Sequence, residues 1–217
     1  MSNPDSFIEE VTEEVRRDRL FALMRRYGWI AVLAVVLIVG GAAYKEWRNA
    51  RDTAAAQALG DALLSALDKD DAAARVAALE AVEAGAEAAP LIALLAAGEE
   101  SAEGQDAEAA ARLRALADDA QAPATYRQLA LLKLLLIEGD ARPADERRAD
   151  LTPLAEPGAP FRPLALEQLA LIEIEQGNTE AAIDRLRELL DLPEATAGLR
   201  ERATQLIVAL GGTPEPA

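Results

Sequence analysis

The feature that most constrains this chain is an uninterrupted apolar run near its N-terminus. Between Arg26 and Lys45, 18 consecutive residues carry no charge, and residues 30–39 are apolar on every helical face. At about 1.5 Å of rise per residue, such a helix spans roughly 27 Å, close to the hydrocarbon thickness of a bilayer. A core helix of a small soluble domain keeps one polar face, which this run lacks. The run therefore predicts a transmembrane helix over residues 27–47.

Aromatic side chains stand at both ends of this run. Tyr27 and Trp29 lie at one end, and Tyr44 and Trp47 lie at the other. They include both tryptophans of the chain and two of its three tyrosines. Amphipathic rings are enriched where a membrane meets water, so we expect these four residues to be membrane-interface aromatics.

A cleaved signal peptide is the main alternative interpretation of the run. It would need a short basic segment directly before an apolar core of roughly 7–15 residues. Here residues 1–26 precede the run and are rich in glutamate, and Ser6 and Glu9 fit a capping box at a helix start. The small residues at 40–43 would suit a cleavage site, but the segment ahead of them resembles a structured helix. We therefore expect the span to be retained.

The charges that flank the span predict its orientation. Five arginines precede it and three basic residues follow it, namely Arg16, Arg17, Arg19, Arg25 and Arg26, then Lys45, Arg48 and Arg51. Basic residues near a span favour the cytoplasmic side. We expect a single-pass protein of a bacterial inner membrane, with a cytoplasmic N-terminus and a periplasmic C-terminal domain. Residues 1–26 are expected to form a cytoplasmic amphipathic helix, lying on the membrane surface or against a partner's helix.

The charge balance and the missing residue types exclude several functions. From Asp52 onward there are 14 basic against 31 acidic residues, a surface that repels nucleic acid and attracts basic partners. The chain has no Cys and no His, which removes disulfides, thiolate or imidazole metal sites and His-assisted nucleophiles. Paired carboxylates remain as possible hydrolase groups, but no phosphate loop or nucleophile elbow accompanies them. We expect no enzyme activity, no cofactor and no metal.

The rest of the chain is expected to be all-α. It is rich in Ala, Leu, Glu and Arg, which favour helices. A helical stalk is predicted over residues 48–70, ended by "DKDDAA", which suits a turn and an N-cap. Glycine and proline signals then divide a domain of residues 71–211 into helices, followed by a disordered tail at 212–217. The expected helices are roughly 71–84, 87–98, 105–119, 123–138, 144–155, 161–176, 179–191 and 195–210.

Turn glycines recur in this domain at a nearly fixed period. Gly104, Gly139 and Gly177 are 35 and 38 residues apart, close to the length of a helix-turn-helix repeat. The surrounding residues resemble a tetratricopeptide (TPR) repeat, in which small residues face each other at a helix crossing and large ones fill the holes around it. Glu173 departs from this pattern, because it stands where the repeat usually has an aromatic residue. The predicted packing residues are Ala97, Gly104, Leu113, Tyr126, Ala130, Gly139, Leu166, Leu169, Ala170, Gly177, Ala182, Leu186 and Pro193.

Two segments carry a wider resemblance. "FIEEVTEEVRRDRLFALMRRYGW" leads into the span, and "EIEQGNTEAAIDRL" lies in the best-matched repeat. With the single span and degenerate repeats, they resemble the YfgM-like family of TPR-like bacterial inner-membrane proteins, ancillary to the Sec translocon. This resemblance implies a membrane-anchored periplasmic domain that associates with the translocon and with periplasmic chaperones. Related single-span TPR-like proteins also accompany respiratory complexes.

The expected function is that of an adaptor or scaffold that helps to assemble inner-membrane protein complexes through a TPR-like α-solenoid of helical hairpins. Gly40, Gly41, Ala42 and Ala43 form a small-residue patch that would let another transmembrane helix approach closely, although a span also tolerates such residues without a partner. The alternative is a structural spacer or oligomerising anchor without a specific client. Exposed apolar residues on the concave face of the solenoid would favour the adaptor, and a uniformly charged face would favour the spacer.

Overall fold

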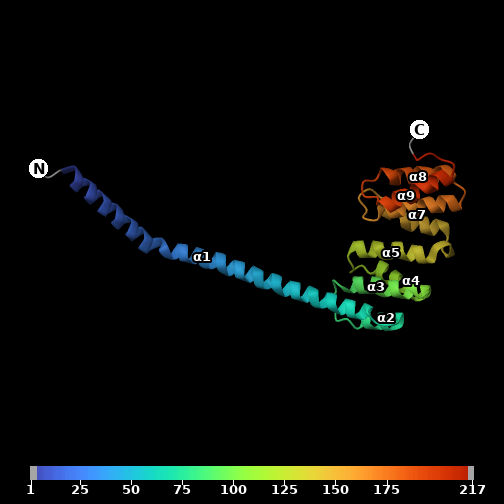
Figure 1. Ribbon diagram of the computed structural model, residues 1–217, viewed down its shortest axis with the longest axis horizontal. Coiled ribbons are helices and arrows are strands. Elements are labelled where there is room, and N and C mark those ends of the chain that lie inside the picture. Colours follow the sequence, from blue (N-terminus) through green and yellow to red (C-terminus); the bar gives the residue numbers. More distant parts are fainter. Residues whose placement is uncertain (1–3, 215–217) are drawn as a thin grey trace. The chain divides into compact units, whose positions relative to one another are not determined.

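A computed structural model describes residues 4–214, with side chains described from residue 24 onward except at Ala31. Within this described part every regular element is helical, as the composition predicts (Figure 1). The side chains of the predicted capping box at Ser6 and Glu9, and the tail end at 215–217, lie outside the described residues. The elements are α1 (Pro4–Leu67), α2 (Ala72–Glu80), α3 (Ala89–Ala102), α4 (Asp106–Asp118), α5 (Ala124–Glu138), the 3₁₀ turn η1 (Gly139–Ala141), α6 (Ala144–Leu151), the 3₁₀ turn η2 (Thr152–Ala155), α7 (Arg162–Glu175), α8 (Thr179–Asp191) and α9 (Ala197–Ala209).

The chain forms two units, Met1–Asp61 and Ala62–Ala217. The first unit contains most of α1, which begins at Pro4, two residues ahead of the predicted cap at Ser6. The α1 segment Met24–Leu67 includes an 18-residue window of mean hydropathy 2.0, and no residue of this window is buried. Among the described residues this is the one helix long and apolar enough to cross a membrane. Because no part of the window is buried, the window is not a core helix of this chain.

The second unit is compact, and it includes the last turns of α1. Ala66 is 3% exposed and packs in one cluster with Leu79 of α2 and Ala96 of α3. Leu63 and Leu67 border the same cluster, at the spacing that gives a helix one apolar stripe. The sequence-based boundary assigned residues 48–70 to a stalk, whereas residues 62–67 belong to the compact unit. This difference arises because Leu63, Ala66 and Leu67 pack against residues of α2 and α3, and that packing cannot be read from the sequence of α1 alone.

The short turn after α1 follows the predicted chemistry. The helix ends at Leu67, and α2 begins after Asp71, whose carboxylate accepts a hydrogen bond from the backbone N–H of Ala74 at 2.7 Å. This satisfies one of the free donors of the first turn. The predicted end of the long helix and the N-cap in "DKDDAA" are therefore confirmed.

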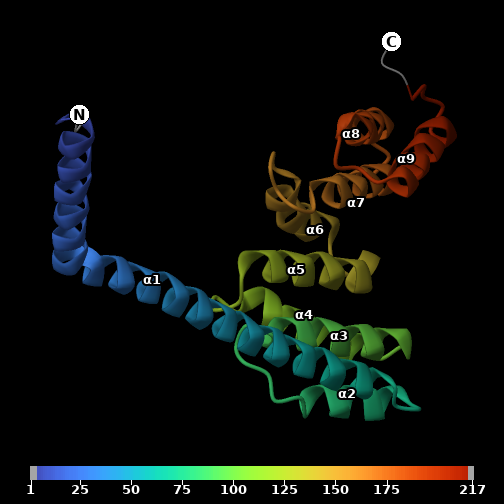
Figure 2. The ribbon, with the colours of Figure 1, turned by 60° about the vertical axis from the view of Figure 1, so that its left-hand side comes forward.

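Consecutive helices of the compact unit pack on one another, from α2 on α3 through to α8 on α9. Figure 2 shows them following each other as layers, with α6 between α5 and α7. Helices two apart also touch, both in the pair α3 and α5 and in the pair α7 and α9. The predicted helices of residues 71–211 are all present, although the segment expected as 144–155 divides into α6 and η2.

Two of the predicted turn glycines close their helices in the same way. Gly104 and Gly177 have φ of +74° and +78°, the left-handed region that glycine adopts without a steric penalty. The residue after each donates to a carbonyl five residues back, Gln105 to Glu100 at 2.9 Å and Asn178 to Glu173 at 2.8 Å. This is the Schellman C-cap. Gly139 differs, because it starts η1 rather than leading directly into a second long helix.

Candidate interaction surface

The small residues predicted at the helix crossings are fully enclosed. Ala97 and Ala109 are 1% and 0% exposed in the α3/α4 hairpin, and Ala170 and Ala182 are both 0% exposed in the α7/α8 hairpin. The predicted large residues Leu113, Leu166, Leu169 and Leu186 are buried around them, and Ala130 is buried on α5. Tyr126 is partly buried against the first of these clusters, whereas Pro193 is exposed after the end of α8. The buried positions among them therefore form packing contacts rather than a chemical site, whereas Pro193 does not pack into the core.

Three carboxylates lie inside the compact unit. Glu100, Glu167 and Glu173 are 5%, 6% and 6% exposed, and each is hydrogen-bonded to an arginine or an asparagine. The sequence pattern marked only Glu173 as unusual, and the burial of these three carboxylates was not among the predictions. One signal was available: Glu100 with Arg112 and Glu173 with Arg185 share a twelve-residue spacing across a turn glycine. A repeated acid–base spacing of this kind is what a buried ion pair between two packed helices requires.

Glu100 of α3 is held by a single guanidinium. Arg112 of α4 donates from Nη2 to Oε1 at 2.6 Å and from Nε to Oε2 at 3.1 Å. The same Arg112 reaches Glu80 of α2 at 2.8 Å. The hydrogen bond to Glu100 raises the pKa of Arg112 above its usual value, against the opposing effect of burial. This ion pair therefore joins α2, α3 and α4.

Glu173 of α7 is held by three groups. The side-chain amide of Asn178 donates to it at 2.9 Å, and guanidinium nitrogens of Arg148 and Arg185 lie 3.3 Å and 3.6 Å from its Oε1. The hydrogen bond from Asn178 holds the pKa of Glu173 below its usual value, assisted by the two arginines and opposed by burial. The carboxylate therefore stays ionised and ties α6, α7 and α8 together.

Glu167, on the same helix, faces α9. Arg202 of α9 donates from Nε to Oε1 at 2.8 Å and from Nη2 to Oε2 at 3.1 Å, a two-pronged pair. The hydrogen bond to Glu167 raises the pKa of Arg202. This pair lies at the edge of a hollow of about 500 Å³ between α7 and α9.

The two helices that border this hollow, α7 and α9, also carry exposed apolar side chains. Leu164 and Leu171 on α7 are each 39% exposed, and Val208 on α9 is 59% exposed. Gln168, Leu171, Gln205, Leu206 and Ala209 line the hollow together with the Glu167–Arg202 pair. We call the exposed Leu164, Leu171 and Val208, together with the partly buried Leu206, the apolar face. Its one charged pair is matched, so the face is nearly neutral in a chain of net charge −16.

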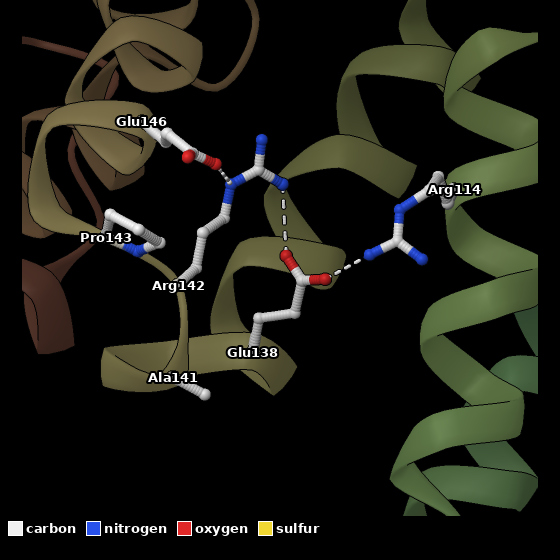
Figure 3. Close-up of a pocket in the computed structure, with 6 residues that line it drawn as sticks. All are labelled: Arg114, Glu138, Ala141, Arg142, Pro143 and Glu146. Carbon is white, nitrogen blue, oxygen red and sulfur yellow. Dashed lines mark hydrogen bonds and ion pairs between the residues drawn. The ribbon is translucent and has the colours of Figure 1, made fainter.

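A second hollow, of about 370 Å³, is filled by matched charges instead (Figure 3). Arg142 donates from Nη1 to Glu138 at 3.0 Å and from Nη2 to Asp150 at 2.5 Å, and its Nε lies 3.6 Å from Glu146. Arg114 also pairs with Glu138. Burial lowers the pKa of Arg142, but the surrounding carboxylates raise it by more, so its pKa lies above the usual value. These groups satisfy one another and therefore act as a clamp between α4, α5 and α6. In the described part of the chain, no three acidic side chains converge to hold a metal ion.

The predicted membrane-interface aromatics are exposed on α1. The rings of Tyr44 and Trp47 lie 6.1 Å apart, and the guanidinium of Arg51 lies 5.7 Å from the centre of the Trp47 ring. At the other end, Tyr27 and Trp29 are exposed, and Arg26 lies 5.8 Å from the Tyr27 ring. The four residues of the small patch, Gly40, Gly41, Ala42 and Ala43, are exposed as well, with open space where a Cβ would stand on either glycine.

In a comparison with known proteins, a single family model covers both the apolar run of α1 and the first helices of the compact unit. The family described as "Tetratricopeptide repeat-like domain" has a model that matches residues 25–156. The match begins two residues ahead of the apolar run and ends after η2, so α7 to α9, with the best repeat in the sequence, lie beyond it. No curated protein and no solved structure matches the chain. Because the match covers more than half of the sequence, the chain belongs to the tetratricopeptide repeat-like domain family.

Proposed function

We propose that this protein is a membrane-anchored adaptor that docks onto protein complexes of a bacterial inner membrane. TPR-like domains serve protein–protein interaction, and the family match includes the apolar run. In this proposal residues 27–47 anchor the chain, the N-terminus is cytoplasmic and the compact unit is periplasmic. Support comes from the length and hydropathy of the span, its exposed aromatic ends and the excess of arginine before it.

The observation that carries the adaptor role is the apolar face on α7 and α9. Exposed apolar side chains that gather beside a hollow mark interaction sites, because their burial against a partner is favourable. A spacer needs only a solvated, charged surface. The apolar face therefore favours the adaptor over the spacer.

We extend the proposal to the arrangement of the helices and to the partner. Contacts between alternate helices and the repeated Schellman turns support a stack of hairpins, that is, a solenoid. The resemblance to the YfgM-like family supports a translocon or a respiratory-chain complex as the partner. Periplasmic chaperones and basic periplasmic proteins remain further candidates, since the compact unit is acidic.

The membrane part of the proposal can be tested by labelling, because the chain has no native Cys. Ala181 is exposed on α8, so an Ala181→Cys variant presents one thiol on the compact unit. In intact bacterial cells, a bulky maleimide that enters the periplasm but does not cross the inner membrane should label Ala181→Cys. It should label Ser2→Cys only after lysis. Equal labelling of both variants in intact cells, or release of the protein from membranes by alkaline carbonate, would overturn the topology.

The partner can be sought by native gel electrophoresis of gently solubilised membranes, followed by mass spectrometry of the shifted band. Co-migration with translocon subunits or with cytochrome subunits would decide between the two partner classes. Leu164→Gln, Leu171→Gln and Val208→Gln combined should abolish the shift if the apolar face binds the complex. Leu64→Gln is the control, since Leu64 is a leucine outside that face and is more exposed than Leu164 and Leu171. Migration of the wild-type protein as a lone monomer would contradict the adaptor role.

The transmembrane patch makes a separate contribution that the same gel measures. Gly40→Leu with Gly41→Leu would fill the open space beside the helix without disturbing packing inside this chain. Weaker association is expected if another helix docks there. Unchanged co-migration would restrict the role of the span to anchoring.

A further inference from the structure

Arg127 of α5 stands apart from the other arginines of the compact unit. Twelve arginines follow residue 62, and the side chains of eleven of them hydrogen-bond or ion-pair with a carboxylate or a backbone carbonyl in the described structure. In the described part of the chain, no side-chain nitrogen of Arg127 has a hydrogen-bond or ion-pair partner, although acidic residues outnumber basic ones about two to one after Asp52. Its isolation is therefore not explained by a shortage of carboxylates.

The Nε atom of Arg127 is also removed from solvent without a hydrogen bond. Arg142 and Arg185 likewise bury an Nε that makes no hydrogen bond, but their terminal nitrogens hold carboxylates. A buried donor that finds no acceptor costs free energy, so nearly all such groups in folded proteins are satisfied by protein, water or ligand. Arg127 alone combines a buried unpaired Nε with unpaired terminal nitrogens among the described arginines after residue 62.

Arg127 lines a hollow of about 270 Å³ that lies between α4, α5, α6 and η2. Leu131, Pro153 and Leu154 give this hollow an apolar wall, and Gln128 adds an amide. Asp150 also lines it, but its carboxylate is held by Arg142 at 2.5 Å. The hollow thus offers one unneutralised cation beside an apolar wall. We call it the Arg127 hollow.

The irregular hairpin of the sequence creates this hollow. The regular turns at Gly104 and Gly177 lead directly into a second helix, whereas after Gly139 the chain forms η1, α6 and η2. The walls from Pro153 and Leu154 belong to η2, which has no counterpart in the two regular hairpins. The insertion that weakens the repeat pattern therefore builds a feature that the regular hairpins lack.

We infer that the Arg127 hollow binds a small monocarboxylate that carries a short apolar chain. The fork of a guanidinium matches a carboxylate, and the leucine and proline wall suits a few methylene groups. The charge of Asp150 disfavours a dianion such as phosphate, because like charges repel at short range. This inference is independent of the adaptor role and of any membrane anchor.

The test is an NMR titration of the full-length protein in detergent micelles at neutral pH, with sodium butyrate as the probe. The Arg127 Nε–Hε signal and the backbone amides of Leu131 and Leu154 should shift saturably at millimolar butyrate. Inorganic phosphate and butan-1-ol should bind at least about tenfold more weakly, since one lacks the apolar chain and the other the charge. Arg127→Gln should weaken butyrate binding about tenfold or more, followed on the two amides.

Lys133→Gln is the matched control, because Lys133 lies on the same helix and its loss changes the charge equally. It should leave butyrate binding unchanged, and circular dichroism should give the same helix content for both variants. Linear, unsaturable shifts, or equal binding by Arg127→Gln, would overturn the inference. Tighter binding of phosphate than of butyrate would overturn it as well. So would a large shift of the Arg127 Nε–Hε signal in Asp150→Asn without butyrate, which would reveal an internal ion pair.

Discussion

The α3/α4 and α7/α8 hairpins are two versions of one unit, related by a shift of 73 residues. Gly104 corresponds to Gly177, and the enclosed pairs Ala97 with Ala109 and Ala170 with Ala182 correspond as well. The turn hydrogen bonds agree within about 0.1 Å. Each hairpin also buries a glutamate at the same place, whose own carbonyl accepts the Schellman hydrogen bond.

The hairpins differ in how that glutamate is held. Glu100 depends on Arg112 alone, whereas Glu173 is shared by Arg148, Arg185 and Asn178. Where the first hairpin has a buried Leu94, the second has Glu167, which pairs with α9. The turn and the crossing thus follow from residues inside the hairpin. The charge partners depend on which helices lie next to it.

The largest effect is expected in the shared part of the two hairpins. Leu113 and Leu186 occupy equivalent positions and are both 0% exposed. Leu113→Ala and Leu186→Ala should each lower the free energy of unfolding by about 3 kcal/mol, because each leaves a cavity. Urea denaturation of the full-length protein in mild detergent, followed by circular dichroism, measures both. If the two losses differ by more than about 2 kcal/mol, the two leucines are not equivalent, because differences in how far the surroundings collapse into the cavity account for only about that much.

The second prediction concerns the partners of the buried glutamate, in which the two hairpins differ. Arg112→Met leaves Glu100 buried without a partner, which should lower the free energy of unfolding by about 3 kcal/mol. Arg185→Met should cost only about 1 kcal/mol, because Arg148 and Asn178 still hold Glu173. The same urea titrations measure this pair. Equal losses would show that the additional partners of Glu173 contribute nothing to its stability.

The third prediction concerns the turn glycines. Gly104→Ala and Gly177→Ala should each lower the free energy of unfolding by about 1 kcal/mol, because alanine at positive φ is strained. Gly98→Ala is the control, since Gly98 lies inside α3 with open space for a Cβ. It should raise stability by about 0.5 kcal/mol through its higher helix propensity. A gain at either turn glycine would contradict the common turn geometry.

The smallest effect is expected in the pH dependence. The pKa of Glu173 is lower in the folded protein than in the unfolded chain, so its ionised form stabilises the fold. This contribution is present above the unfolded pKa of about 4.3, and it is lost as pH falls through the lower folded pKa. Glu173→Gln should remove this part of the acid destabilisation, measured as the urea midpoint against pH. Asn178→Ala should move the loss to higher pH, and an unchanged profile in both variants would exclude Glu173 as a contributor.

Much of the fold could be predicted from the sequence because it depends on local properties. Helix propensity and the glycine and proline positions placed α2 to α9 within a few residues, except for the division of α6 and η2. Hydropathy alone identified the exposed apolar helix, since a long run without charges needs no tertiary information to be recognised. The glycine period also indicated the family to which the chain belongs.

What the tertiary structure decided is where buried charge and free surface lie. The repeat position of Glu173 and its spacing from Arg185 set it apart from the other glutamates, but its burial depends on Arg148, 25 residues earlier, and on the packing of α6 and α8. The apolar face and the Arg127 hollow likewise form only where helices from separate hairpins meet. The end of α1 joined the compact unit for the same reason. Sequence patterns determine what each segment prefers, whereas burial is a property of the assembled neighbours.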